Sequence, residues 1–107
     1  MPKFLLKASY TQQGVKGVID KGGSSRRDAV THAVEGMGGS VESFHFALGD
    51  DDVFVVADLP DASAATALSL TVNAAGGAAV KTVPLLTPEE VDQAGGKSLP
   101  DYRPPGS

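Results

Sequence analysis

The segment from residue 40 to residue 58 constrains the fold of this chain more than any other. It reads SVESFHFAL, then GDDD, then VFVVAD. Its first part alternates between two faces, with Phe44, Phe46 and Leu48 on one and Val41, Ser43, His45 and Ala47 on the other. Such alternation is typical of a strand with two unlike faces, and the apolar run 53–57 indicates a central strand buried on both sides. Gly49 and the aspartates that follow it favour a tight turn, so the segment predicts a β-hairpin.

Strand patterns at residues 3–9 and 78–86 and two helical patterns surround this hairpin. The first helix is predicted to begin at an N-cap Ser25 and to end at Gly38, after a short helical turn at residues 15–19. The second helix is predicted between a capping Asp61 and the pair 76–77. The order strand, helix, strand, strand, helix, strand predicts an α+β, ferredoxin-like βαββαβ sandwich. In this fold two helices cover one face of a four-stranded antiparallel sheet.

The C-terminal part combines a helix signal with a tail. Thr87, Pro88 and Glu90 stand at the cap, first helical and capping-box positions of a short helix that is predicted to end near Ala94. The remaining residues are rich in proline and poor in apolar side chains, which predicts no structure of their own. We therefore expect one domain over residues 1–94 and a tail over residues 95–107.

Composition excludes several function classes. A formal net charge of −4 disfavours nucleic acid as a partner, because nucleic-acid binding needs clustered lysine and arginine. The chain has no cysteine, hence no disulfide, thiol chemistry or thiolate metal site. The apolar stretch at the N-terminus is too short for a signal peptide or a membrane span. We expect a cytoplasmic protein that binds no membrane and needs no cofactor.

A four-stranded sheet with helices on one side leaves its other face open. That face is predicted to carry Leu5, Val41, His45 and part of the run 53–57, with Lys7 and Lys81 nearby. An apolar patch of this kind usually marks an interface or a groove. The simplest arrangement is a homodimer, of the dimeric α/β-barrel kind, that encloses a cavity between two sheets. Replacing Leu5 or Val55 by a charged residue is then expected to break the oligomer.

Several short motifs together resemble the GYD domain family. They are Tyr10-Thr11-x-x-Gly14, Gly38-Gly39, Leu48-Gly49-x-x-Asp52, Pro60-Asp61 and Leu86-Thr87-Pro88-Glu89-Glu90. The resemblance covers roughly residues 3–92 and implies a small ferredoxin-like domain that assembles like dimeric α/β barrels. It implies no assigned activity. Asp51 stands where the family has its tyrosine.

Asp50, Asp51 and Asp52 are the most conspicuous acidic cluster. Three adjacent carboxylates offer oxygen ligands to a hard cation, but the spacing of a calcium loop is missing. Neighbouring residues of a turn also point in different directions, so we expect a solvated hairpin tip and no metal site. Asp52 is expected to bond nearby backbone amides and to fix the turn.

His45 is the weak candidate for catalysis, as an acid or base near neutral pH, although a packed interface histidine fits the pattern equally. Lys7 and Lys81 are expected to be neighbours if the first and last strands pair. With His45, and with Tyr10 at the mouth of the same cavity, they form the candidate ligand-binding set for a small anion. Two lysines extending from an edge are the alternative.

The leading functional hypothesis is an oligomeric small-molecule-binding or interaction module that uses the open sheet face. One alternative is a cofactor-free enzyme of the dimeric α/β-barrel kind, in which His45 acts on a small apolar or aromatic substrate oriented by Tyr10 or Lys7. Another is a purely structural protein that self-associates.

Overall fold

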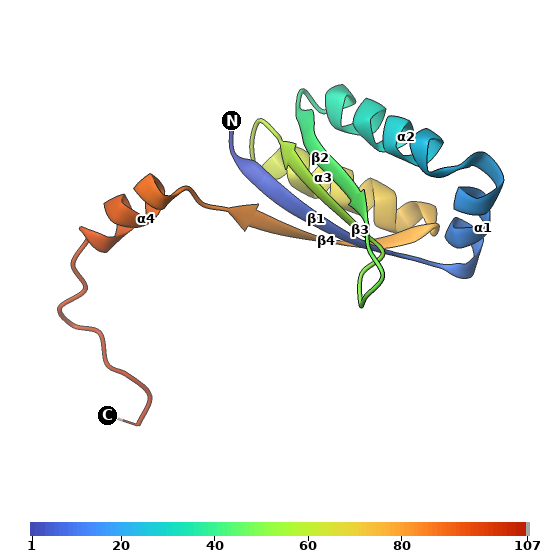
Figure 1. Ribbon diagram of the computed structural model, residues 1–107. Coiled ribbons are helices and arrows are strands. Elements are labelled where there is room, and N and C mark those ends of the chain that lie inside the picture. Colours follow the sequence, from blue (N-terminus) through green and yellow to red (C-terminus); the bar gives the residue numbers. More distant parts are fainter. Residues whose placement is uncertain (107) are drawn as a thin grey trace.

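The computed structural model describes residues 1–106, which form four strands and four helices (Figure 1). In chain order the elements are β1 (Lys3–Tyr10), α1 (Gln12–Lys21), α2 (Gly23–Gly36), β2 (Ser40–Phe46), β3 (Val53–Asp58), α3 (Ala62–Ala75), β4 (Ala78–Leu85) and α4 (Pro88–Gly95). The strands form one sheet in the order β2-β3-β1-β4, and every neighbouring pair is antiparallel. The predicted α+β class, the hairpin and the four-stranded antiparallel sheet are thereby confirmed. The element and strand orders are those of a ferredoxin-like sandwich.

One face of the sheet and two helices enclose the core. Phe4 and Leu6 of β1 and Val55 of β3 pack against Val34 of α2 and Leu68 of α3, and each of these side chains is at most 5% exposed. The remaining core residues are Val53, Ala57, Leu59 and Ala65. Alternation along β1 and β3 therefore sends every second side chain into the core, and the residues between them face the other way.

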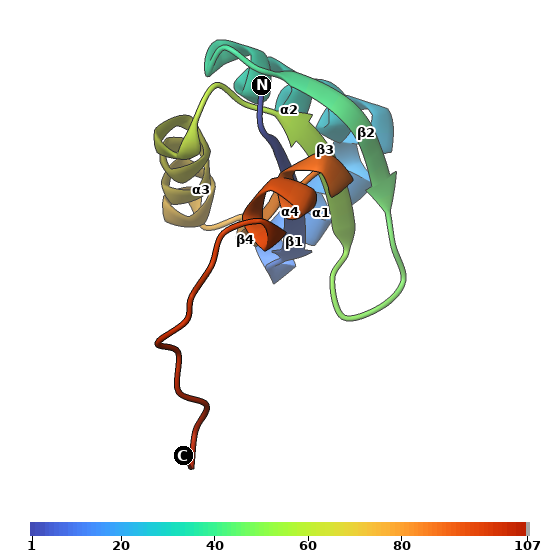
Figure 2. The ribbon, with the colours of Figure 1, turned by 90° about the vertical axis from the view of Figure 1, so that its left-hand side faces the viewer.

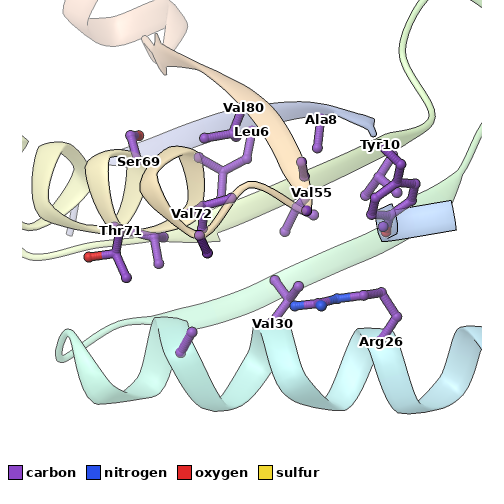
Figure 3. A pocket seen from close by; sticks show the side chains of 17 residues that line it. Leu6, Ala8, Tyr10, Arg26, Val30, Val55, Ser69, Thr71, Val72 and Val80 are labelled. Carbon is purple, nitrogen blue, oxygen red and sulfur yellow. The ribbon is translucent and has the colours of Figure 1, made fainter. Parts of the chain in front are cut away.

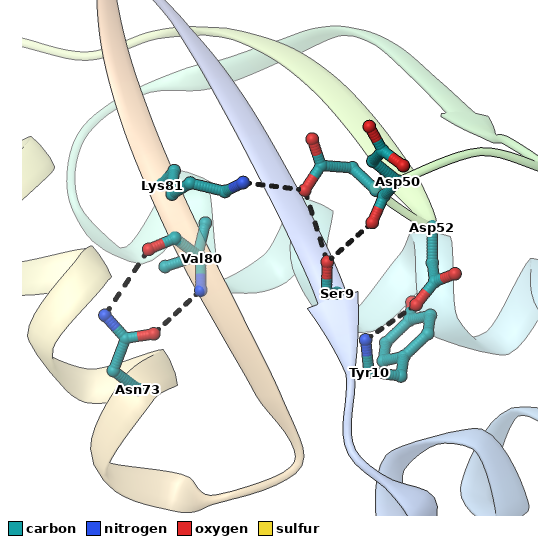
Figure 4. A network of polar contacts seen from close by, with 8 residues as sticks. Ser9, Tyr10, Asp50, Asp52, Asn73, Val80 and Lys81 are labelled. Atoms are coloured by element: carbon teal, nitrogen blue, oxygen red, sulfur yellow. Dashed lines mark hydrogen bonds and ion pairs between the residues drawn. The ribbon is translucent and has the colours of Figure 1, made fainter.

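The edge strand β4 is protected at Val80. Asn73 of α3 accepts a hydrogen bond from the Val80 backbone N–H at 2.7 Å, and its side-chain amide donates to the Val80 carbonyl (Figure 4). The asparagine thus occupies backbone groups that an edge strand otherwise presents to another chain.

The first helical region differs from its prediction. Instead of a turn at residues 15–19, α1 is a complete helix of 10 residues capped by Thr11, whose hydroxyl accepts from the Gly14 N–H. Ser25 is not an N-cap, because α2 begins at Gly23 and its N-cap is Gly22. Gly22 also ends α1, by donating to the Val18 carbonyl at 2.8 Å. One glycine therefore joins the two helices directly and leaves no room for a separate cap at position 25.

The later caps agree with the sequence. Asp61 accepts from the Ala64 N–H at 2.8 Å, and α3 ends at Gly76 in the left-handed conformation. Thr87 and Glu90 form a capping box at α4, with Pro88 at the first helical turn.

A β-bulge corrects the assignment of faces in β2. The pairing with β3 shifts between Val41 and Ser43, so that Val41 pairs with Ala57 on the helix side, where it packs against the core. A bulge adds one residue to one strand and reverses the alternation beyond it. Val41 is therefore not part of the open face, as strict alternation had predicted.

The chain leaves the sheet after β4. Helix α4 lies apart from the sheet and the other helices (Figure 1), and the residues that follow it, up to residue 106, extend away from the rest of the chain (Figure 2). From residue 97 to residue 106 the chain has neither helix nor strand. Among residues 1–106, no helix combines the length and the apolar character needed to cross a bilayer.

Candidate functional site

The open sheet face consists of outward-facing residues in register across the strands. Leu5 of β1 lies between Val56 of β3 and Val83 of β4, and Lys7 lies between Phe54 and Lys81. His45 of β2 lies opposite Phe54, and Leu85 lies opposite Lys3. Within residues 1–106, no apolar residue of this face is buried. The predicted neighbourhood of Lys7 and Lys81 is confirmed, and His45 lies on the face predicted for it.

At one end of this face, Lys3 forms ion pairs with two carboxylates. The Lys3 ammonium lies 3.0 Å from a carboxylate oxygen of Asp58 and 3.3 Å from one of Glu42. The hydrogen bond to Asp58 and that to Glu42 raise the pKa of Lys3 above its usual value. Two carboxylates and one ammonium therefore leave this end acidic.

At the other end of this face, Asp51 links the hairpin loop to the sheet, a role that the sequence did not predict. Asp51 is only 8% exposed, and its carboxylate lies 3.1 Å from the Lys81 ammonium and accepts from the Ser9 hydroxyl at 3.2 Å (Figure 4). The hydrogen bond from Lys81, with a further one from Ser9, lowers the pKa of Asp51 below its ordinary value. Asp51 therefore stays ionised at neutral pH and joins the hairpin loop to β1 and β4. Among the described residues, this leaves Lys7 as the cation of the open face without an ion pair.

Asp52 bonds a backbone amide, but one from another strand. Its carboxylate accepts from the Tyr10 N–H at 2.8 Å, while its own N–H donates to the Ala8 carbonyl at 2.8 Å. The expected bond to a backbone amide is present, and it fastens the loop to the end of β1. No group of three or more side chains suited to hold a metal occurs in residues 1–106.

Replacing Asp52 by alanine is expected to lower the free energy of unfolding by about 1–3 kcal/mol, because the partly buried Tyr10 N–H loses its partner. Urea denaturation followed by circular dichroism measures this loss. Asp50→Ala is the matched control, since no side-chain hydrogen bond of Asp50 occurs within residues 1–106, and it should stay within about 0.5 kcal/mol of the parent. Equal losses of unfolding free energy in the two variants would show that the hydrogen bond between Asp52 and the Tyr10 N–H does not stabilise the fold.

The predicted ligand set is divided between the two faces of the sheet. Lys7, His45 and Lys81 share the open face, whereas the Tyr10 side chain lies on the helix side together with Ala8 and Leu6 (Figure 3). Tyr10 therefore does not line the same cavity as the other three, and the sequence expectation is wrong on this point. The reason is the period of two, which puts residues 7 and 10 of one strand on opposite faces.

His45 has no orienting partner in the described part of the chain. It is exposed on an edge strand, and its imidazole makes no hydrogen bond or ion pair among residues 1–106. A catalytic base generally needs a second group that fixes its tautomer and direction. Catalysis by His45 stays a prediction of the sequence.

A second concave site, which sequence reasoning also missed, lies between the sheet and the helices. It is a cavity of about 260 Å³ lined by α2, α3 and the helix-side residues of β1, β3 and β4 (Figure 3). Most of its wall is aliphatic, and Tyr10 and Arg26 contribute polar groups. No motif marks it, since its lining residues come from six elements far apart in the sequence, including α1 through Gly14.

The model of the GYD domain family matches residues 4–94. The chain belongs to the GYD domain family. Comparison with curated proteins and comparison with solved structures gave no match. Membership confirms the resemblance and carries no assigned activity, so function has to be argued from the sites themselves.

The motif Tyr10-Thr11-x-x-Gly14 joins the end of β1 to the turn that precedes β4. The Thr11 N–H donates a hydrogen bond to the Gly77 carbonyl at 3.1 Å, and the Thr11 hydroxyl donates one to the Gly76 carbonyl. Both carbonyls belong to the turn between α3 and β4. Gly14 lies so close to Gly77 that a Cβ on it would stand 1.9 Å from the Gly77 oxygen. This motif therefore docks α1 on the α3–β4 turn, which is a structural role.

The other GYD motifs also have structural roles here. A Cβ on Gly39 would stand 2.1 Å from the Asp58 oxygen, so the glycine lets β2 start close to the end of β3. Asp52 fastens the hairpin loop, and Asp61 and Thr87 cap their helices. With aspartate in place of the family tyrosine, position 51 carries the ion pair to Lys81.

Proposed function

We propose that this GYD domain is a non-catalytic, self-associating module whose open sheet face packs against the same face of a second copy. The observation that carries the proposal is the composition of that face. Its central row is Val56, Leu5 and Val83, and Phe54 and Leu85 flank it on the neighbouring rows. Adjacent apolar side chains that no element of the same chain covers are typical of an interface.

The charges of the face favour a second copy as the occupant. The end around Lys3 carries the carboxylates of Glu42 and Asp58, and the opposite end carries Lys7 together with the Lys81–Asp51 pair. A two-fold axis that lies between the two sheets, parallel to their planes and perpendicular to the strands, turns one copy end over end. The unpaired Lys7 then meets the acidic end of the partner, and the apolar rows meet each other.

The enzyme alternative has less support. It requires His45 and an orienting Tyr10 or Lys7 around one substrate, and Tyr10 lies on the other side of the sheet. His45 and Lys7 remain on the open face, where packing of two sheets would cover them. Ligand binding by Lys7, His45 and Lys81 stays a prediction of the sequence.

We expect the purified protein to run as a dimer in light scattering coupled to size exclusion, and Leu5→Asp to raise its dissociation constant. The rise should be at least about a hundredfold, because a symmetric interface contains the substitution twice. Val83→Asp, at a more exposed position that is 37% accessible, should act in the same direction if Leu5→Asp folds poorly.

The control is Ile19→Asp, which removes an exposed apolar side chain of α1, 75% accessible, away from the open face. This variant should remain a dimer. A monomeric parent protein, or a dimer that tolerates both changes on the sheet, would rule out the proposed interface.

A further inference from the structure

The cavity between the helices and the sheet lies on the face of the sheet opposite the proposed interface. Its wall includes Leu6, Val30, Val55, Val72 and Val80, which come from β1, α2, β3, α3 and β4 (Figure 3). A volume of about 260 Å³ exceeds the ~150 Å³ of an engineered apolar cavity that binds benzene. The space therefore suits one aromatic ring or a branched aliphatic chain with a small polar group.

The polar groups that line the cavity are of two kinds. The hydroxyls of Ser69 and Thr71 are engaged within α3, where they donate to the carbonyls of Ala65 and Ala67 at 2.9 and 2.8 Å. By contrast, no hydrogen bond or ion pair of the Arg26 guanidinium or the Tyr10 hydroxyl occurs among residues 1–106. These two groups are free to receive a ligand.

Arg26 and Tyr10 both line the cavity, and the Arg26 charge lies close enough to act on the Tyr10 phenol. The Arg26 side chain runs along α2 toward Val30, on the side of the helix that faces the sheet (Figure 3). Burial raises the pKa of the Tyr10 phenol, and the nearby Arg26 charge opposes that shift. The phenol is thus protonated at neutral pH and donates a hydrogen bond, while the guanidinium offers a fork of N–H donors.

We propose that this cavity binds a small aromatic or branched aliphatic monocarboxylate, with its apolar body among the valines and its carboxylate on Arg26 and Tyr10. A guanidinium matches a carboxylate with two parallel hydrogen bonds, and a neutral phenol adds a third donor. Asp52, whose negative charge acts on the Tyr10 phenol in the direction opposite to Arg26, has one carboxylate oxygen bonded to the Tyr10 backbone N–H. The site uses no residue of the open sheet face and is independent of self-association.

The test is a fluorine NMR titration of para-fluorobenzoate with the full chain. Binding should broaden or shift the fluorine signal. Arg26→Gln should raise the dissociation constant by at least about tenfold, as expected for loss of a charge-assisted hydrogen bond. Tyr10→Phe should raise it by a smaller factor. The neutral analogue para-fluorobenzamide should bind the parent more weakly and be insensitive to Arg26→Gln.

Two kinds of control separate this site from general attraction of an anion. Arg27 is the matched residue, since it is adjacent, exposed and paired with Asp28 at 3.3 Å, and Arg27→Gln should leave binding unchanged. Ala33 of α2 and Ala75 of α3 are exposed alanines that line the cavity, so Ala33→Phe, or Ala75→Phe if the first folds poorly, should block binding. Lack of binding by the parent protein, equal losses in the two arginine variants, or binding that survives a phenylalanine in the cavity would each overturn the proposal.

Discussion

Replacing Val55 by aspartate is expected to abolish the folded state. Val55 is 3% exposed on β3, and its neighbours in the sheet are Leu6 of β1 and Phe44 of β2. An unpaired carboxylate at this position loses its hydration without gaining a partner, a cost of several kcal/mol. Domains of this size are stable by only about 5–15 kcal/mol, so the variant should show no cooperative thermal transition by circular dichroism.

Val56→Asp is the control for this expectation and changes the adjacent residue. Val56 lies on the open face opposite Leu5, is only partly buried, and its side chain can reach solvent. This variant should melt cooperatively, close to the parent, while weakening self-association. Loss of the fold in both variants, or in neither, would contradict the assignment of the two faces. The sequence prediction named both Leu5 and Val55 as interface positions. It is wrong for Val55, which belongs to the core.

Gly14→Ala is expected to destabilise the protein by about 3 kcal/mol, at the upper end of what overpacking usually costs. The added Cβ would stand 1.9 Å from the carbonyl oxygen of Gly77 and 2.9 Å from its carbon. Both are backbone atoms, which cannot rotate away as a side chain can. Either α1 or the α3–β4 turn must move, and the hydrogen bond from the Thr11 N–H to Gly77 would be strained. Denaturation in urea measures the change in the free energy of unfolding.

Gly17→Ala provides the comparison within the same helix. A Cβ at Gly17 meets no atom within 4 Å, so this substitution should stabilise the protein by about 0.4–1 kcal/mol through the lower entropy of the unfolded chain. The two substitutions are chemically identical and should have opposite signs. Destabilisation of similar size in both would mean that α1 does not dock on the turn at Gly77.

The elements that sequence patterns predicted well are those that local interactions define. Asp61 and Thr87 cap their helices as expected, because a cap depends on residues three positions apart. The run 53–57 forms a strand of the sheet interior, since β-branched residues favour that conformation, but only the face with Val53, Val55 and Ala57 is buried, and the prediction of burial on both sides is wrong. Helix α1 was underestimated because it has two glycines and no buried side chain, so its docking at Gly77 stabilises it more than its own pattern does.

Neither candidate site was predicted complete. The bulge beside Val41 reversed one face assignment, and a shift of one residue is enough to do so. The placement of Tyr10 separated it from Lys7, and the cavity that Tyr10 lines has walls from six elements. Arg26 was not predicted to bind a ligand, because its aliphatic surroundings are assembled only by folding.

The sequence by itself determined the family, the order of strands and helices, and most of the positions where helices begin and end. These depend on periodicity and capping, which act over a few residues. Only the tertiary structure decided that Asp51 meets Ser9 and Lys81, that Asp52 bonds Tyr10, and that Arg26 and Tyr10 share a cavity. Ser9 and Tyr10 stand 42 residues from their aspartate partners, and no local rule links positions so far apart. Contacts at that separation follow from strand pairing and from which side of the sheet each residue faces, both of which require the packed core.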